Sequence, residues 1–243
     1  MTTERRRILV VDDDAPLRKV LRIGLTASGF LVEETASAEA ALRLIPKQAF
    51  DLALLDVNIP DMSGFELCGR IRSLAPRLGI VMVTVRNAEK DVVQAFEAGA
   101  DDYIVKPFRF PELTARLSAV LRRTHSGSTE KLGVLRARDL EMDLDRRLVL
   151  RTGKAVHLSP IEFELLALLM KNEGVPLTHG KLLHEIWGAE YGGELEYLRS
   201  YVKTLRKKIE SDPARPAYVL TEPRVGYKFC NPSDPDLASR HTA

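Results

Sequence analysis

The sequence is poor in cysteine, tryptophan and long apolar runs, and these shortages exclude several classes of protein. Its two cysteines, Cys68 and Cys230, lie far apart without metal-ligand spacing, which argues against a disulfide framework or a zinc module. The longest strongly apolar stretch, residues 165–170, is far shorter than a membrane span. The charged start of the chain precedes an apolar run too short for a signal peptide. We therefore expect a cytoplasmic protein with no membrane partner.

The chain also lacks a strong excess of charge. Its net charge is +2, and each side of His125 carries 18 basic against 17 acidic residues. Nucleic-acid binding must therefore be argued from local clusters of basic residues. A length of 243 residues allows two compact domains, and 45% hydrophobic with 29% charged residues is typical of a globular protein.

Four short apolar runs, 8–11, 52–55, 80–83 and 103–105, predict parallel strands of an α/β sheet. Polar residues follow these runs directly: Asp12, Asp13 and Asp14, then Asp56, Thr84, and Lys106 before Pro107. Ligands bind at the carboxyl ends of such strands, and crowded carboxylates there suit Mg²⁺. Each aspartate could instead be a turn former or helix cap, as Asp14 before Pro16 suggests. The coincidence of all four strand ends favours a functional site.

The segments 11–14, 55–64, 83–84 and 99–108 resemble, in order, the receiver domain of response regulators. The resemblance covers about residues 7–123 and implies a flavodoxin-like (βα)₅ fold, in which Asp56 accepts a phosphoryl group from a sensor histidine kinase. It also implies that Asp13, Asp56 and the main-chain carbonyl of Asn58 hold Mg²⁺, with Asp12 acting through water. It assigns Thr84 and Lys106 to the phosphoryl oxygens, Thr84 and Tyr103 to the conformational switch, and a cis peptide bond to Lys106-Pro107.

The second half of the chain has a different periodicity. Alternating short strands are predicted over 140–158 with a turn at 152–154, and Ser159-Pro160-Ile161-Glu162 marks a helix start with a capping box. Further helices are predicted around 180–187 and 196–210, and a hairpin over 218–229. The predicted organisation is a receiver domain at 1–124, a polar linker at 125–132, an α+β domain at 133–231, which a family resemblance implies to be a winged helix-turn-helix domain, and a fraying tail at 232–243.

The predicted helix 196–210 carries a concentrated basic face beside an apolar stripe of Leu198, Val202, Leu205 and Ile209. Arg199, Lys203 and Arg206 share that face, with Lys207 and Lys208 beside them. A charged face is usually only solvated surface, but five basic residues without an acid fit a DNA-recognition helix.

The segments 158–166, 201–206 and 226–229 resemble the winged-helix effector of the OmpR/PhoB family, and 195–205 with 212–216 resemble its KdpE-like branch of potassium-transport regulators. The resemblance implies double-stranded promoter DNA and RNA polymerase as partners, with potassium-transport genes as candidate targets. The predicted DNA-binding residues are Arg199, Lys203, Arg206, Lys207, Arg224 and Tyr227.

The family pattern also implies a homodimer on activation, through salt bridges on one face of the receiver domain. Glu97, Asp101, Asp102, Glu112 and Arg116 retain members of that set, whereas Val92 and Ser118 stand where basic residues are common. Exposed ion pairs contribute only about 0–1 kcal/mol each, so their loss weakens such a dimer without abolishing it. Val85 is a second departure, and it either narrows access to the phosphoryl group or packs beside the strand end.

We therefore interpret the chain as a two-component transcriptional response regulator and not as an enzyme. One alternative, prompted by Val92 and Ser118, is a DNA-binding regulator that does not need phosphorylation. A Mg²⁺-dependent aspartyl phosphohydrolase is a weaker alternative, in which Asp12 and Asp14 would form the acidic pair. Against it, Pro16 stands where such enzymes carry Thr or Val, no cap domain interrupts the sheet, and the basic helix would be unexplained.

Overall fold

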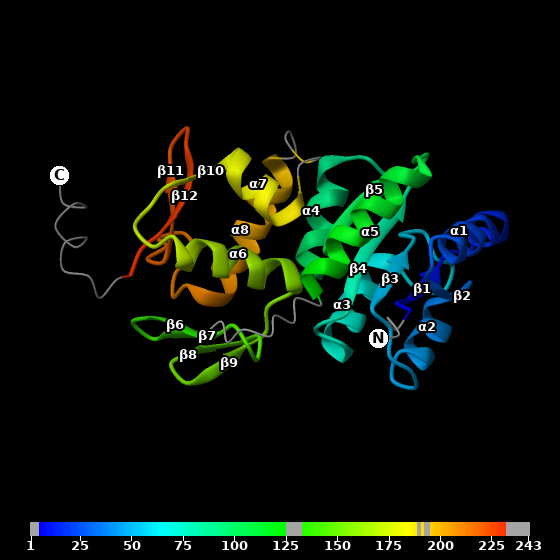
Figure 1. Ribbon diagram of the computed structural model, residues 1–243, viewed down its shortest axis with the longest axis horizontal. Coiled ribbons are helices and arrows are strands. Elements are labelled where there is room, and N and C mark those ends of the chain that lie inside the picture. The colour runs from blue at the N-terminus through cyan, green and yellow to red at the C-terminus, as the bar shows by residue number, and fades with distance from the viewer. Residues whose placement is uncertain (1–4, 125–132, 189–190, 192–194, 232–243) are drawn as a thin grey trace. The chain divides into compact units, whose positions relative to one another are not determined.

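The computed structural model describes residues 5–124, 133–188, 191 and 195–231 (Figure 1). The chain divides into two compact units, Met1–His125 and Ser126–Ala243. The linker and the tail predicted at 125–132 and 232–243 lie outside the described residues. Within the described part of the chain, every helix is too short or too polar to cross a membrane.

In the N-terminal unit, strands and helices alternate along the chain. The strands are β1 (Arg7–Val11), β2 (Leu31–Thr35), β3 (Leu52–Leu55), β4 (Gly79–Thr84) and β5 (Asp102–Val105). The helices are α1 (Ala15–Ala27), α2 (Ala38–Leu44), α3 (Gly64–Leu74), α4 (Glu89–Ala98) and α5 (Phe110–Thr124). All five strands are parallel in the order β2-β1-β3-β4-β5. This confirms the predicted flavodoxin-like (βα)₅ fold.

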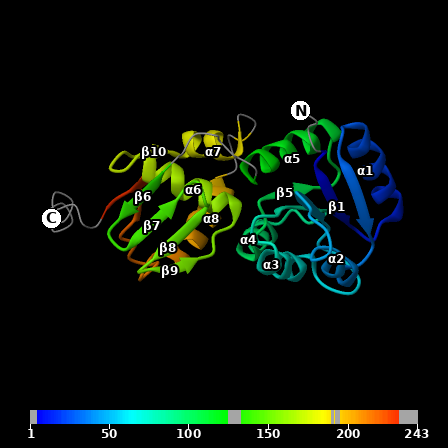
Figure 2. The same ribbon diagram turned by 60° about the horizontal axis from the view of Figure 1, so that its bottom comes forward.

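Helices cover both faces of the parallel sheet, with α1 and α5 on one face and α2, α3 and α4 on the other (Figure 2). Both faces are therefore shielded from water, which explains why the inner strands read as continuous apolar runs. The core under α1 and α5 contains Leu21 and Leu25 of α1, Leu113, Leu117, Val120 and Leu121 of α5, and Ile8, Val10, Leu52, Leu54, Val81, Val83 and Ile104 of the sheet.

The strand register aligns the polar residues at the carboxyl edge. Val11 pairs with Leu55 across β1 and β3, and the Asp56 amide donates to the Val11 carbonyl oxygen at 2.8 Å. Asp12 and Asp56 therefore leave the sheet side by side. Asp14 then caps α1, because its side chain accepts a hydrogen bond from the Leu17 amide.

The C-terminal unit begins with an antiparallel sheet of β6 (Val134–Ala137), β7 (Leu140–Asp143), β8 (Leu148–Arg151) and β9 (Lys154–Val156). Three helices follow: α6 (Pro160–Lys171), α7 (His179–Trp187) and α8 (Leu195–Ile209). A second sheet contains β10 (Leu177–Thr178), β12 (Gly226–Phe229) and β11 (Val219–Glu222) in that order. The α+β winged helix-turn-helix prediction is thus confirmed for this unit.

Local sequence signals account for several boundaries of the C-terminal unit. Thr152 and Gly153 both have positive φ angles, 49° and 75°, as a two-residue hairpin turn between β8 and β9 requires. Ser159 and Glu162 form the predicted capping box at the start of α6. Gly226 is needed for close approach, because a Cβ atom there would lie 2.0 Å from the Leu177 carbonyl oxygen.

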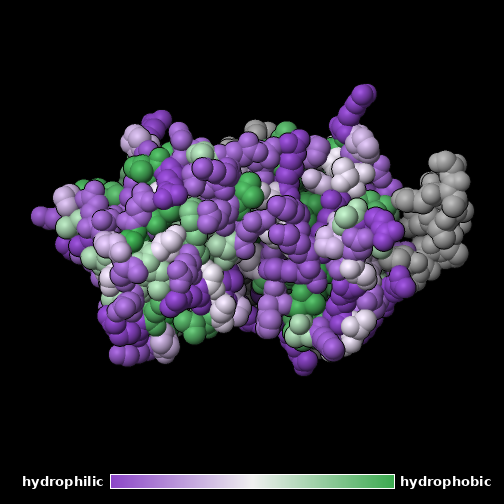
Figure 3. Space-filling model, turned by 180° about the vertical axis from the view of Figure 1, so that it is seen from behind, coloured by the Kyte–Doolittle hydropathy of each residue, from purple (hydrophilic) through white to green (hydrophobic). Residues whose placement is uncertain are grey.

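Hydrophobic side chains that reach the surface are scattered. On the face shown in Figure 3 they form small separate groups among hydrophilic residues. Exposed examples in the N-terminal unit are Val20 and Ile23 of α1, Leu74 of α3, and Val85. Singly exposed apolar residues of this kind are normal in globular proteins.

Candidate functional sites

The carboxyl edge of the parallel sheet holds a nearly buried cluster of two carboxylates and one ammonium group. Lys106 Nζ donates to Asp12 Oδ2 at 2.7 Å and to Asp56 Oδ1 at 2.8 Å. Asp12 and Asp56 are only 3% and 4% exposed. The Lys106-Pro107 peptide bond is cis, as predicted. The structure therefore brings together side chains separated by about 50 and 94 positions in the chain.

Burial and pairing shape the electrostatics of this cluster. Burial raises the pKa of Asp12, although hydrogen bonds from Lys106 and from the Asp14 amide oppose that rise. Burial by itself would lower the pKa of Lys106, but its hydrogen bonds to Asp12 and Asp56 outweigh burial and raise the pKa above the ordinary value. Lys106 therefore stays charged at neutral pH, between two carboxylates that would otherwise repel each other.

Main-chain donors hold the remaining carboxylate oxygens. The Asn58 amide donates to Asp56 Oδ2 at 2.5 Å, and the Asp14 amide donates to Asp12 Oδ1 at 2.9 Å. Gly64, the first residue of α3, lets the helix approach this loop, because a Cβ atom there would lie 2.0 Å from the Asp56 carbonyl oxygen. The orientation of the Asp56 carboxylate is thus set by the chain around it.

Asp13, the other predicted magnesium ligand, is exposed beside this cluster. Across the residues described, the structure gathers no group of three or more His, Cys, Asp or Glu side chains that could hold a metal ion. The available donors nevertheless suit Mg²⁺ in kind: the two buried carboxylates of Asp12 and Asp56, the exposed carboxylate of Asp13, which follows Asp12 in the chain, and main-chain carbonyl oxygens are all hard oxygen ligands.

The two predicted switch residues converge on a residue that sequence reasoning missed, Arg86. Thr84 is fully buried and its Oγ1 accepts a hydrogen bond from the Arg86 amide at 3.4 Å. Tyr103, 1% exposed, donates from its hydroxyl to the Arg86 carbonyl oxygen at 3.0 Å, and burial raises its pKa to about 12. Arg86 also donates from Nε to Asn58 Oδ1 at 3.2 Å. The sequence feature that could have pointed to Arg86 is its position two residues after Thr84, the threonine at the strand end.

Val85, between these residues, has a side chain that is mostly exposed. Packing beside the strand end therefore does not account for it. Its effect on access to a phosphoryl group stays a prediction.

The residues predicted for a dimer face occupy different environments. Glu97 is exposed on α4, whereas Arg116 of α5 bonds within its own unit to Asp102 at 3.3 Å and to Glu112 at 3.1 Å. Asp101 and Asp102 are fully buried, and Asp101 pairs with Arg72 at 2.8 Å. Ser118 is exposed and donates to the Thr114 carbonyl oxygen of its own helix. Asp101 is therefore committed to an interior ion pair, while Glu97, Glu112 and Ser118 remain accessible.

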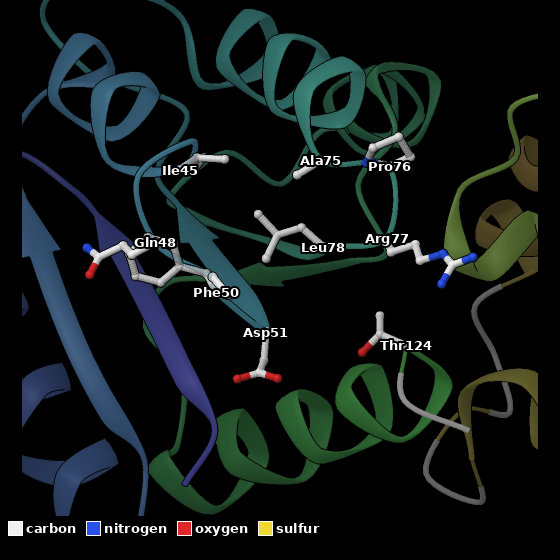
Figure 4. A pocket seen from close by; sticks show the side chains of 10 residues that line it. Ile45, Gln48, Phe50, Asp51, Ala75, Pro76, Arg77, Leu78 and Thr124 are labelled. Atoms are coloured by element: carbon white, nitrogen blue, oxygen red, sulfur yellow. The ribbon is translucent and has the colours of Figure 1, made fainter. Parts of the chain in front are cut away.

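A cavity of about 570 Å³ lies at the opposite, amino end of the same sheet (Figure 4). It is lined by Ile45, Gln48, Ala49, Phe50, Asp51, Ala75, Pro76, Arg77, Leu78 and Thr124. Asp51 accepts hydrogen bonds there from Arg6 Nη1 and the Arg7 amide. None of the predicted site residues lines this cavity, so it is separate from the carboxylate cluster.

In the C-terminal unit, α8 presents the basic face that the sequence predicts. Leu198, Val202, Leu205 and Ile209 are buried, which confirms the apolar stripe. Arg199, Lys203 and Lys207 are exposed on the other side, and Arg199 forms an ion pair with Glu196 one turn earlier. Lys208 is engaged in an ion pair within the unit, because its Nζ donates to the buried carboxylate of Glu162 at 2.5 Å. The accessible positive charge of α8 is thus smaller than its sequence suggests.

Arg206, also predicted to contact DNA, is bound to the hairpin that follows α8. Its Nε and Nη2 donate to the Val219 carbonyl oxygen at 2.9 and 2.6 Å, and Nη2 also donates to Thr221 Oγ1 at 2.9 Å. Its guanidinium lies 5.7 Å from the centre of the buried Tyr227 ring. Arg224 is exposed at the hairpin turn with a φ of 66°. The hairpin is therefore fastened to α8 through Arg206.

Comparisons with known proteins agree with this two-part arrangement. Residues 8–118 match the response regulator receiver domain, and residues 153–229 match the C-terminal domain of transcriptional regulatory proteins. The chain is 38% identical over 224 residues to the transcriptional regulatory protein KdpE of Mycobacterium tuberculosis, which covers 91% of this chain and 98% of that protein. It is 39% identical over 222 residues to the KDP operon transcriptional regulatory protein KdpE of Escherichia coli, with the same two coverages.

Other relatives have different names. The sensory transduction protein RegX3 of Mycobacterium tuberculosis is 40% identical over 223 residues, covering 91% of this chain and 98% of that protein. Among solved structures, the response regulator DrrB, a Thermotoga maritima OmpR/PhoB homologue, matches 93% of this chain and 99% of its own, with 35% identity and a TM-score of 0.51. A RitR mutant structure matches 92% of this chain and 98% of its own, with 26% identity and a TM-score of 0.76.

Proposed function

Because the chain belongs to the OmpR/PhoB family of two-component response regulators, we propose that Asp56 accepts a phosphoryl group from a sensor histidine kinase and thereby controls promoter binding by the C-terminal unit. The observation that carries this proposal is the buried Asp12–Lys106–Asp56 cluster. It holds a carboxylate nucleophile against a cation where little water enters. Phosphoryl transfer depends mainly on such positioning and charge neutralisation.

The transfer step uses Asp56, its partner Lys106 and the nearby strand-end residue Thr84. A carboxylate oxygen of Asp56 attacks the phosphorus of the donor's phosphohistidine, so that an O–P bond forms as the N–P bond breaks. The imidazole nitrogen keeps the electron pair of the broken bond. Lys106, which touches Asp56 at 2.8 Å, compensates the charge on the phosphoryl oxygens, and the Thr84 hydroxyl donates to one of them.

Magnesium is the cofactor that this donor set suits. Asp13, Asp56 and the Asn58 main-chain carbonyl oxygen would hold it, with Asp12 acting through water. Bound there, Mg²⁺ neutralises charge on the carboxylates and on the incoming phosphoryl group. Lys106 orients Asp56 by donating hydrogen bonds to Asp56 Oδ1 and to Asp12 Oδ2.

Phosphorylation of the intact chain by acetyl phosphate with Mg²⁺, followed by intact mass, tests the assignment. The wild type should gain one phosphoryl group, and Asp56→Asn should gain none, because an amide is a poor nucleophile. Asp14→Asn is the matched control: it removes a nearby exposed carboxylate but keeps a good cap for α1. Labelling that persists in Asp56→Asn would place the phosphoacceptor elsewhere.

DNA binding is assigned to α8 and the following hairpin. The exposed residues of α8 that would contact DNA phosphates or base edges are Arg199, Lys203 and Lys207. Arg224 at the hairpin turn would contact the neighbouring sugar-phosphate backbone of the DNA. Arg206 and Tyr227 contribute by holding the hairpin against the helix. Action on promoter DNA also leads us to propose the cytoplasm as its location.

Phosphorylation is proposed to act through dimerisation. Two receiver domains pair through the accessible part of the α4–β5–α5 face, and the two winged helices then occupy adjacent half-sites and recruit RNA polymerase. Val92 and Ser118 favour a second possibility, a regulator that binds DNA without phosphorylation. Equal operator affinity of the wild type and Asp56→Asn in the presence of acetyl phosphate would support that second possibility.

Potassium-transport genes are the proposed targets, because two of the similar proteins are named KdpE and one of them is named for the KDP operon. RegX3, which has a different name, is similar to this chain at a comparable identity, so the target genes could differ from those of a KdpE protein. Footprinting of the phosphorylated protein on the potassium-transport promoter of its own genome tests the proposal, with the promoter of an unrelated gene as the control. The transcription regulators among the relatives give no support to phosphatase turnover, which an assay with a generic phosphate ester would detect.

A further inference from the structure

Arg86 is the point at which four parts of the N-terminal unit meet. Its amide and carbonyl groups bond Thr84 and Tyr103, and its guanidinium bonds Asn58 and Asp91 of α4, the latter from Nη1 at 3.3 Å. The Asn58 amide in turn donates to Asp56 Oδ2. The guanidinium of Arg86 is thus separated from the Asp56 carboxylate by a single residue.

The partner of Arg86 on α4 is a buried carboxylate at a poorly capped helix end. Asp91 is 6% exposed, whereas the Arg86 side chain is 46% exposed. The N-cap residue of α4, Ala88, makes no side-chain capping hydrogen bond. Within the described residues, Arg86 is the cation that pairs with Asp91. The charge of Asp91 near this helix end is therefore compensated by a cation whose side chain is partly open to solvent.

We propose that Arg86 is a third cation for the phosphoryl group, besides Mg²⁺ and Lys106. Before phosphorylation its guanidinium is paired with Asp91. Phosphorylation of Asp56 adds about 1.5–2 negative charges within reach of the guanidinium. Arg86 then exchanges the Asp91 carboxylate for a phosphoryl oxygen and leaves the first turn of α4 without its partner. This inference rests on the proposed phosphorylation of Asp56 and assigns a phosphoryl-binding role to a residue outside the predicted set.

The exchange couples the phosphoryl group to the switch residues. The Arg86 main chain is bonded to Thr84 and Tyr103, so a movement of Arg86 toward Asp56 displaces the acceptor of the Tyr103 hydroxyl. The same movement releases Asp91 at the start of α4. One side chain would thereby connect the site to the face on which dimerisation is proposed.

Two substitutions that break the same ion pair should have opposite effects on phosphoryl affinity. Beryllofluoride, a non-covalent phosphoryl mimic, can be titrated with Mg²⁺ into the full chain and its bound fraction read by fluorine NMR. Arg86→Ala should weaken binding by roughly tenfold, the effect of one lost charge-assisted hydrogen bond. Asp91→Asn should strengthen binding, because Arg86 no longer has to leave a carboxylate. The double variant should behave like Arg86→Ala.

The outcomes separate this inference from the proposed function. If the two single variants shift affinity in the same direction, or not at all, the ion pair is only structural and the inference is wrong. Arg43→Ala, which breaks an exposed ion pair with Glu39 on α2, should bind beryllofluoride like the wild type. A wild type that neither binds beryllofluoride nor accepts a phosphoryl group overturns the proposed function as well. Amide exchange gives an independent reading: residues 89–93 should exchange faster when the mimic is bound.

Discussion

The Arg206 guanidinium on α8 binds the Val219 carbonyl oxygen of β11 through both Nε and Nη2, at 2.9 and 2.6 Å. A side chain expected to reach DNA is therefore occupied in joining the helix to the hairpin. Burial also lowers the pKa of Arg206, but the ordinary pKa of arginine is so high that the side chain remains charged at physiological pH. Its role in DNA binding should therefore differ in kind from that of Lys203, one turn earlier on α8.

Arg206→Ala and Lys203→Ala should be distinguishable by stability and salt dependence. Arg206→Ala leaves the Val219 carbonyl oxygen without its donor, so the free energy of unfolding should fall by about 2 kcal/mol. Lys203→Ala should change it by less than about 0.5 kcal/mol but lower the salt slope of DNA binding by about one unit. Urea unfolding and operator titrations at several salt concentrations measure both. A lowered slope with unchanged stability in Arg206→Ala would mean that Arg206 contacts phosphate directly.

Two glycines of α3 should respond oppositely to alanine. At Gly64 a Cβ atom would meet the Asp56 carbonyl oxygen at 2.0 Å, so Gly64→Ala must displace the loop that orients Asp56. Stability and acetyl-phosphate labelling should both fall. At Gly69 the nearest atom is 3.9 Å away, so Gly69→Ala should stabilise by about 0.5–1 kcal/mol with labelling unchanged. Normal labelling in a folded Gly64→Ala would contradict the close approach.

Lys106→Met should make stability fall more steeply with rising pH. Burial already raises the pKa of Asp12 above 3.8, and the substitution removes the hydrogen bond from Lys106 that opposes the rise. Between 3.8 and this raised value the folded state binds more protons than the unfolded state, so stability is lost as pH increases. The destabilisation should reach about 3–5 kcal/mol at neutral pH and be much smaller near pH 4.

Urea unfolding of the wild type and Lys106→Met across this pH range measures the effect. Adding Asp12→Asn to Lys106→Met should flatten the pH dependence, because the group that titrates has been removed. A destabilisation by Lys106→Met that is the same at both ends of the range would show that the lysine contributes by packing alone.

Asp13→Ala should weaken Mg²⁺ binding by removing an exposed carboxylate beside the cluster, with little effect on the metal-free fold. Thermal unfolding with increasing Mg²⁺ measures this: the wild type should gain stability, and Asp13→Ala should gain less at each concentration. Asp14→Asn provides the control for local charge. Equal stabilisation of wild type and Asp13→Ala would place the metal elsewhere.

Ser118→Arg should strengthen the proposed receiver dimer. Ser118 is exposed on α5 and its hydroxyl bonds only the Thr114 carbonyl among the described contacts, so a longer basic side chain meets no packing obstacle. The wild type should dimerise weakly and more strongly with beryllofluoride, and both Ser118→Arg and Val92→Arg should shift sedimentation toward the dimer. A tight dimer without beryllofluoride that ignores both substitutions would mean that another surface pairs.

Sequence reasoning succeeded where a local pattern carries the physical cause. The inner strands were visible as apolar runs because both faces of the sheet are covered, and the caps of α1 and α6 were visible because capping depends on residues three apart. It did not single out β2, β6 or β10. β2 is an edge strand with Glu33 and Glu34 among its five residues. β6 has only four residues, one of them Arg136, and β10 has only two, too few for any periodicity.

Local patterns in the sequence predict the sheet, its strand ends and hence the meeting of Asp12, Asp56, Thr84 and Lys106, because strand register and connection rules act on such patterns. Which charged residues remain available to bind a partner depends instead on how the chain packs. The sequence does not distinguish Arg206, Asp101 and Asp102 from charged residues at the surface, yet each is bound to a partner within its own unit. A charged side chain bonds the groups that come within about 3 Å of it. Those groups lie on segments far apart in the chain, so no short stretch of sequence shows which of them will meet.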